Sequence, residues 1–141
     1  MTCRRGAFVD SWFPFAERPT VPAPVRHIVY VQTMVRLRTG ALRALVMLTT
    51  TSPRMIEAIP DGLGVTVSRE SSLRMGMRNA FTIDVHRLAL LPPEPAWFPD
   101  IGAERFIIAH ADAHLRETIA RRYEDMRLRY PNPAVVVGPG M

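Results

Sequence analysis

Two alternating segments joined by a long basic connector constrain the fold of this chain more than any other feature. They lie between residues 64 and 91 of the 141-residue sequence. In the first, Val65 and Val67 alternate with polar residues, and residues 81–86 repeat the pattern. A period of two predicts two half-buried β-strands, because successive side chains of a strand point to opposite faces. Residues 69–78 between them exceed the usual hairpin turn of about two to five residues, so we expect an extended loop.

The loop predicted over residues 69–78 is basic and carries methionines. Its cations are Arg69, Arg74 and Arg78, and Glu70 is its one acid. A loop without a core of its own is expected to be ordered by a partner, and a polyanion is the simplest partner for arginines. A solvated basic loop is the alternative. Its apolar residues, which need cover from water, are Leu73, Met75 and Met77.

The segments before this region have the patterns of a strand and a helix. Residues 26–35 alternate, with apolar side chains on both faces, and predict a central strand. Residues 41–48 are strong helix formers and predict a helix that stops before Pro53. Residues 54–59 then predict a short extended piece, which ends at a turn over residues 60–62.

The segments after it have the patterns of a helix and a strand. Residues 111–129 predict the best helix of the chain, capped by Asp112. Its apolar stripe consists of Leu115, Ile119, Tyr123 and Met126. Residues 134–137 predict a final short strand. The order strand, helix, strand, long loop, strand, helix, strand predicts an α+β fold: a ferredoxin-like β-α-β-β-α-β sandwich, with both helices on one face of a four-stranded antiparallel sheet.

Two further segments lie outside this plan. Residues 1–25 hold aromatic residues and closely spaced prolines, so we expect an extended, irregular N-terminal arm before a single domain over residues 26–141. The aromatic cluster of the arm docks either on its own domain or on a neighbouring protein, and consists of Trp12, Phe13 and Phe15. Prolines within residues 92–95 end the second strand, and Trp97 with Phe98 predicts a buried anchor in the loop that follows.

The charge of the chain favours an acidic partner. The net charge is +5 at neutral pH and the sequence pI is about 10.6. All 18 basic residues are arginine, which suits bidentate phosphate binding, although a GC-rich coding genome also accounts for the missing lysines. Residues 21–92 hold nine arginines against four acids, whereas residues 93–141 hold six against seven. The basic excess therefore belongs to the half with the connector, and nucleic acid is the commonest partner of such a surface.

Few residues are candidates for catalysis or metal binding. His110 and His114 have the i, i+4 spacing of a zinc site on a helix, but the glutamate of the H-E-x-x-H motif and a third ligand are missing. We expect surface histidines there, with a small metal-dependent enzyme as an alternative. A single cysteine, Cys3, excludes an internal disulfide, and no apolar run approaches the roughly 18 residues of a membrane span. The sequence thus predicts a protein that is not an enzyme, without metal, cofactor, small-molecule substrate or membrane association.

The connector and its two strands also contain a spaced motif: T-V, eleven residues ending in arginine, two further residues, and then F-x-I-x-x-H. Its residues are Thr66, Val67, Arg78, Phe81, Ile83 and His86. This motif resembles the small-subunit ribosomal protein S-ten family, and the resemblance covers residues 26–92, about half the chain. The departures are Glu70-Ser71-Ser72 in place of the family's S-P-H triplet and Met75 in place of its loop lysine.

The resemblance implies a structural constituent of the head of the small ribosomal subunit. A divergent, mitochondrial form is expected, located in the mitochondrial matrix rather than in a bacterial cytoplasm, with an insertion at about residues 93–107. Its partners are ribosomal RNA and neighbouring ribosomal proteins. The alternative is a ferredoxin-like interaction subunit of another large assembly, without RNA binding.

The site residues follow from the connector, the resemblance and a second basic patch at the predicted strand-to-helix junction. The expected RNA-binding residues are Arg36, Arg38, Arg43, Arg69, Arg74, Arg78, His86 and Arg87. His86 is equally expected as a structural hydrogen-bonding residue. The expected protein-contact residues are Trp12, Phe13, Phe15, Leu73, Met75 and Met77.

Overall fold

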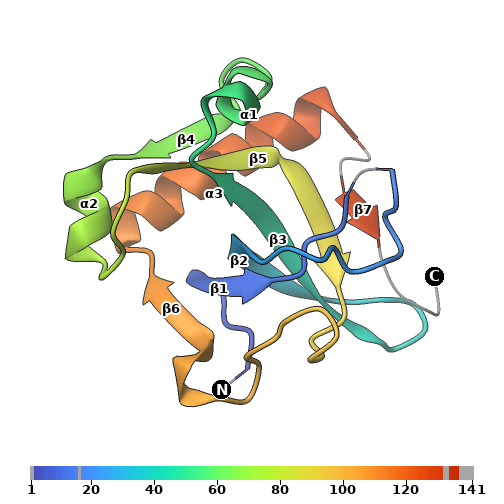
Figure 1. Cartoon of the computed structure of the whole chain (residues 1–141). Helices are drawn as coiled ribbons and strands as arrows, with labels where there is room; N and C mark the ends of the chain where they lie inside the picture. The colour runs from blue at the N-terminus through green and yellow to red at the C-terminus, as the bar shows by residue number, and fades with distance from the viewer. Residues whose placement is uncertain (1, 16, 132–133, 137–141) are drawn as a thin grey trace.

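The computed structural model of the chain describes residues 2–15, 17–131 and 134–136, and its centre is one mixed β-sheet (Figure 1). Six antiparallel strands lie in the order β4-β5-β3-β2-β1-β6, and β7 pairs in parallel with β5. The strands are β1 (Ala7–Ser11), β2 (His27–Arg36), β3 (Leu42–Thr50), β4 (Gly64–Val67), β5 (Phe81–Leu91), β6 (Ile107–His110) and β7 (Ala134–Val136). The helices are α1 (Pro53–Glu57), α2 (Arg69–Arg74), the 3-10 turn η1 (Glu104–Phe106) and α3 (Ala113–Arg129).

One face of the sheet packs against α3, which contacts β4 and β5. Ile119 and Met126 from the helix are fully buried against it. At the centre of this core, the Phe8 ring lies 5.3 Å from that of Tyr30 and 5.4 Å from that of Phe81. The prediction of a helix over residues 111–129 is confirmed, including its cap, because the Asp112 carboxylate accepts a hydrogen bond from the Leu115 amide at 2.8 Å.

The other face of the sheet has a second core, covered by irregular chain rather than by a helix. Three valines of β2 and β3 point to this side: Val29, Val31 and Val46. They alternate along the strands with the residues that face α3. The arm supplies Phe13 and the segment after β5 supplies Trp97, Phe98 and Phe106. The anchor predicted at Trp97 and Phe98 is therefore confirmed, and both faces of the central strands are buried.

Strand β5 bends sharply where it changes neighbours. Leu48 of β3 pairs with Asp84 and Met47 pairs with Leu88, so residues 85–87 bulge out of the ladder. The Asp84 carboxylate closes the bulge by accepting hydrogen bonds from the amides of His86 and Arg87. Before the bulge β5 pairs with β4, and after it with β7.

Several elements agree with their predictions. The central strand over residues 26–35 is β2, which lies between β1 and β3. The two alternating segments are β4 and β5, paired antiparallel. The described part of residues 134–137 is β7. The α+β class is confirmed, and none of the described helices is long and apolar enough to cross a membrane.

The helix predicted over residues 41–48 is wrong, because this segment is strand β3. Its residues are strong helix formers, but all except the first are buried between β2 and β5. A continuous apolar run of this length has the same appearance in a buried strand as in a buried helix. Without a helix between the first two predicted strands, the ferredoxin-like order is not confirmed.

Three other segments differ from their predictions, and the region predicted as an insertion contains structure of its own. The extended loop over residues 69–78 is partly helical, because Ser68 caps α2 by accepting a hydrogen bond from the Ser71 amide. Residues 54–59, predicted extended, contain most of α1, which is capped by Ser52. The arm contains β1, and the region predicted as an insertion leads through η1 into β6.

Candidate functional site

One pocket, which we call the main pocket, lies at one end of the sheet, beside the start of β2. Its volume is about 610 Å³. Four segments that are distant in sequence contribute to its wall: residues 26–28 at the start of β2, residues 49–55 from the end of β3 onward, residues 76–81 up to the start of β5, and Ile108 of β6. The fold therefore assembles a site that no single segment contains.

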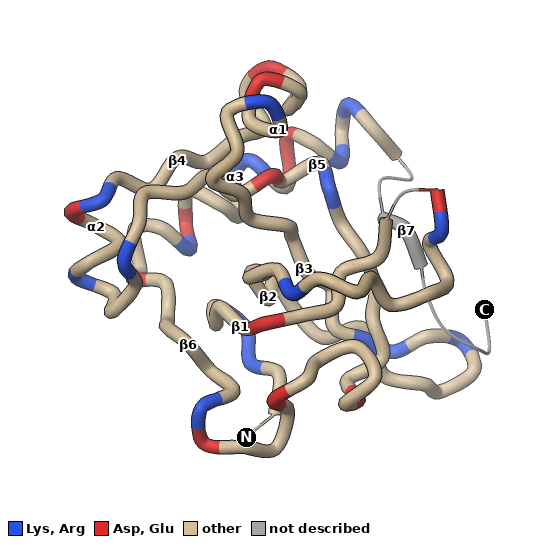
Figure 2. The backbone as a smooth tube through the Cα atoms, in the orientation of Figure 1, with Lys and Arg blue, Asp and Glu red and all other residues tan. Residues whose placement is uncertain are grey.

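The pocket is basic. Arg26 and Arg78 both line it and both are exposed, and none of the described residues that line it is acidic. Basic and acidic positions are otherwise interspersed over the chain (Figure 2), so net charge alone does not locate this site. Arg26 is also paired with Asp100 and Asp10, which lie outside the wall, whereas Arg78 has no ion pair among the described residues. An anion in the pocket would therefore meet Arg78 and the donors of Arg26 that these carboxylates leave, because arginine offers a planar fork of donors to phosphate or carboxylate.

His27 adds an imidazole to the same wall. Its ring is half-buried, and its Nδ1 atom is buried without a hydrogen-bond partner. Burial and the nearby Arg87 charge lower the pKa of His27 below its usual value of 6.5, and an interaction with the Val25 backbone opposes them in part. The imidazole is therefore mainly neutral at neutral pH, which is the form that accepts a proton.

A run of hydroxyl groups begins with the last two residues of β3, Thr49 and Thr50, and continues just after the strand. The Thr49 hydroxyl donates to the Ile28 carbonyl at 2.7 Å, and the Thr50 hydroxyl accepts a hydrogen bond from the Ser52 amide at 3.0 Å. Thr51 is exposed beside them. These contacts fix the backbone at the pocket and present polar groups suited to sugar hydroxyls or phosphate oxygens.

Apolar side chains complete the wall, among them Met55 and Met77. A second hollow of about 620 Å³ adjoins the pocket at Ile108, which lines both. It is lined by Arg74 and His110, and also by the acidic Asp112. Between them the two hollows present cations, one carboxylate, hydroxyl groups and apolar contacts.

The predicted RNA-binding residues are distributed over the molecule rather than gathered at one place. Arg78 lines the main pocket and Arg74 the adjoining hollow, where Arg74 pairs with Glu70 at 3.1 Å. Arg69 is exposed at the start of α2. Arg36 and Arg38 lie at the turn between β2 and β3, the opposite end of these strands from His27 and Thr50, roughly 30 Å away at about 3.3 Å per residue.

The other three predicted RNA-binding residues lie on strands, where they are buried or close to other residues of the protein. Arg43 is only 5% exposed on β3 and donates to the Leu42 carbonyl. Arg87 lies in the β5 bulge, near enough to His27 to affect its pKa. The His86 ring lies 4.5 Å from that of Tyr130.

Some of the predicted protein-contact residues are buried in this domain, and others are exposed to solvent. Phe13 is buried in the second core and Met77 in the core under α3, so these two contact their own domain. Trp12 is half-buried, with its amide hydrogen-bonded to the Trp97 carbonyl at 2.9 Å, and Met75 is half-buried near the α3 side. Phe15 and Leu73 are exposed, by 38% and 55%.

The candidates for metal and nucleophilic chemistry do not gain support from the fold. His110 ends β6 and His114 lies in the first turn of α3, so the two do not share a helical face. In the described part of the chain, no group of three histidine, cysteine, aspartate or glutamate residues is arranged to hold a metal ion. Burial raises the pKa of the Cys3 thiol to about 12, which keeps it protonated and unreactive.

The sequence reasoning missed Arg26, His27 and the hydroxyl run over residues 49–52 as site residues. The one available signal was the unbroken run of threonine and serine before Pro53, which is unusual after an apolar segment. Comparison with known proteins adds no assignment: no model of a protein family matches the chain, and a search of curated proteins finds no match.

Proposed function

We propose that this protein binds single-stranded RNA in the main pocket and cleaves its backbone there. The observation that supports the proposal is the convergence of Arg26, Arg78 and a mainly neutral His27 in one concave wall. RNA is favoured over duplex DNA because the site is a pocket rather than a projecting basic helix, and single strands offer unstacked bases that fill such hollows. The apolar wall at Met55 and Met77 suits a base beside the bound phosphate.

The pocket contains a base and two cations that suit transfer of the RNA phosphoryl group from the 5′-oxygen to the ribose 2′-oxygen. His27 accepts the proton of the 2′-hydroxyl, the 2′-oxygen bonds to phosphorus, and the bond from phosphorus to the 5′-oxygen breaks. The leaving 5′-oxygen takes a proton from solvent, which gives a 2′,3′-cyclic phosphate and a 5′-hydroxyl. Arg26 and Arg78 stabilise the negative charge that develops on the phosphate oxygens. This proposal replaces our expectation of a protein without an active site.

Replacing His27 with asparagine is expected to reduce cleavage at least about 100-fold while RNA affinity changes less than about threefold, because only the proton acceptor is lost. The measurement is single-turnover cleavage of a labelled single-stranded oligonucleotide, with product ends identified by mass. The wild-type rate is expected to rise with pH and to level off at a lower pH than it would for an unperturbed imidazole, because the pKa of His27 is lowered from its usual value and the neutral form dominates above it.

His114→Asn is the matched control, since this histidine is exposed on α3 and does not line the pocket. An oligonucleotide with 2′-deoxyribose at the cleaved position is expected to bind and to stay intact. Cleavage of that oligonucleotide, or equal loss in the two histidine variants, would contradict the assignment of His27.

A role in the small ribosomal subunit is a second proposal. It is favoured by the exposure of Arg74 and Arg78, the two residues that the resemblance assigns to phosphate contacts, at adjoining hollows. The proposal rests on these arginines, because the order of strands differs from the ferredoxin-like plan. A mitochondrial location belongs to this proposal alone.

Sedimentation of a gentle lysate on a sucrose gradient tests the ribosomal proposal. If it holds, the protein migrates with small subunits, and ribonuclease treatment of the lysate abolishes that migration. Migration as a free protein rules it out. A ribonuclease-resistant complex that lacks ribosomal RNA favours an interaction subunit of another assembly.

A further inference from the structure

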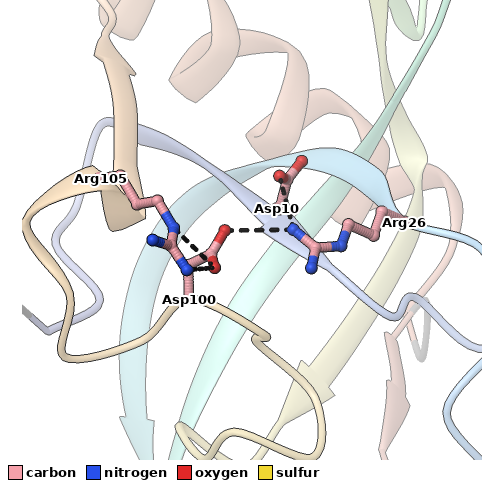
Figure 3. Close-up of polar contacts among 4 residues, drawn as sticks. All are labelled: Asp10, Arg26, Asp100 and Arg105. Atoms are coloured by element: carbon pink, nitrogen blue, oxygen red, sulfur yellow. Dashed lines mark hydrogen bonds and ion pairs between the residues drawn. The ribbon is translucent and has the colours of Figure 1, made fainter.

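A charged network beside the pocket connects Arg26 to the segment between β5 and β6 (Figure 3). Arg26 Nη1 lies 3.2 Å from Asp100 Oδ2 and 3.7 Å from Asp10 Oδ2. The other oxygen of Asp100 accepts from Arg105, at 3.1 Å from Nε and 3.0 Å from Nη2. Asp100 therefore bridges two guanidinium groups, and only one of them, Arg26, lines the pocket.

Asp100 is the buried member of this network. Its side chain is 10% exposed, whereas those of Arg26 and Arg105 are 49% and 79% exposed. The residue follows the Trp97 and Phe98 anchor, which is packed in the second core. Its carboxylate is therefore held in place by the fold, and the exposed arginine adjusts to it rather than the reverse.

Both ion pairs of Arg26 are made by the same nitrogen of its guanidinium group, Nη1. Both carboxylates contact Nη1, and the group lies 5.2 Å from the centre of the Trp12 ring. Within the described chain, Nη2 and Nε have no polar partner. Since arginine has five N–H donors in a rigid plane, holding one nitrogen fixes the direction of the others.

We propose that Asp100 is a positioning residue, which orients the Arg26 guanidinium so that Nη2 and Nε meet the phosphate of bound RNA. Asp100 itself does not contact RNA. The inference rests on the proposed RNA-binding function, and it assigns a role in that function to the segment between β5 and β6. It goes beyond that function by naming a residue outside the pocket that determines its affinity.

A double-mutant cycle between Asp100 and Arg26 tests the positioning role. We expect Asp100→Asn to weaken binding of a non-cleavable 2′-deoxy-substituted RNA about tenfold in the wild-type background and less than about twofold in an Arg26→Gln background. Arg105→Gln is the control, because it removes the other partner of Asp100 and leaves its contact with Arg26 intact. That variant is expected to bind within about twofold of wild type. Thermal unfolding of each variant measures any loss of fold.

The outcomes separate the inference from the function on which it rests. An equal loss from Asp100→Asn in both backgrounds means that the residue acts through the fold, and overturns the positioning role. Wild-type affinity in Asp100→Asn overturns it while the proposed function stands. No RNA binding by the wild-type protein overturns both.

Discussion

Replacing Arg26 and Arg78 together with glutamine is expected to weaken binding of single-stranded RNA about 10- to 100-fold. Each arginine supplies charge-assisted hydrogen bonds to phosphate, and each lost phosphate contact also reduces the release of counterions. The slope of log affinity against log salt concentration is expected to become shallower by about 1.4, from about 0.7 for each single-strand contact. Fluorescence anisotropy at several salt concentrations measures both quantities.

The matched control is the pair Arg36→Gln and Arg38→Gln. It removes the same charge from the turn between β2 and β3, at the far end of these strands from the pocket. A general effect of net charge would weaken both double variants equally. A larger loss from the turn would favour the patch that the sequence indicated and contradict the pocket as the binding site.

Replacing Phe8 with alanine is expected to lower the free energy of unfolding by about 3–5 kcal/mol. Phe8 is fully buried and lies against both Tyr30 and Phe81, so its removal leaves a cavity at the centre of the core under α3. Urea unfolding followed by circular dichroism measures the change from the midpoint and slope.

Phe15→Ala is the control for the stability prediction. The substitution is the same, but Phe15 is 38% exposed at the surface of the arm, and we expect a loss of less than about 1 kcal/mol. Comparable losses in the two variants would show that β1 does not hold the central place in the core that its contacts indicate.

The sequence was sufficient for elements whose pattern is local. The period-two alternation of β4 and the helical stripe with its Asp112 cap in α3 determine the side that each residue buries. It was insufficient for β3, whose residues are buried on both faces and lose any alternation. Strand β1 was missed because five residues among prolines and aromatics gain their structure only by pairing with β2 and β6.

The candidate site was harder to predict than the fold, because its residues come together only through sheet topology. Arg26, Thr50 and Arg78 are far apart in sequence and meet because β2, β3 and β5 are neighbours. Arg78 was found from the composition of its own segment. Arg26 and His27 lie at the junction of the arm with β2, where neither charge density nor spacing distinguishes them.

The position of β1 between β2 and β6 has a consequence for the order of folding. Ala7 pairs with His110, so this ladder joins the start of the chain to a residue that follows all of the other antiparallel strands. Contacts between such distant residues form late, because the entropy of closing the chain between them must be overcome first. As the chain leaves the ribosome, the hairpin of β2 and β3 is able to form early. The edge of β1 stays open until residue 110 has emerged, and a chaperone that covers this edge would protect the nascent protein from aggregation.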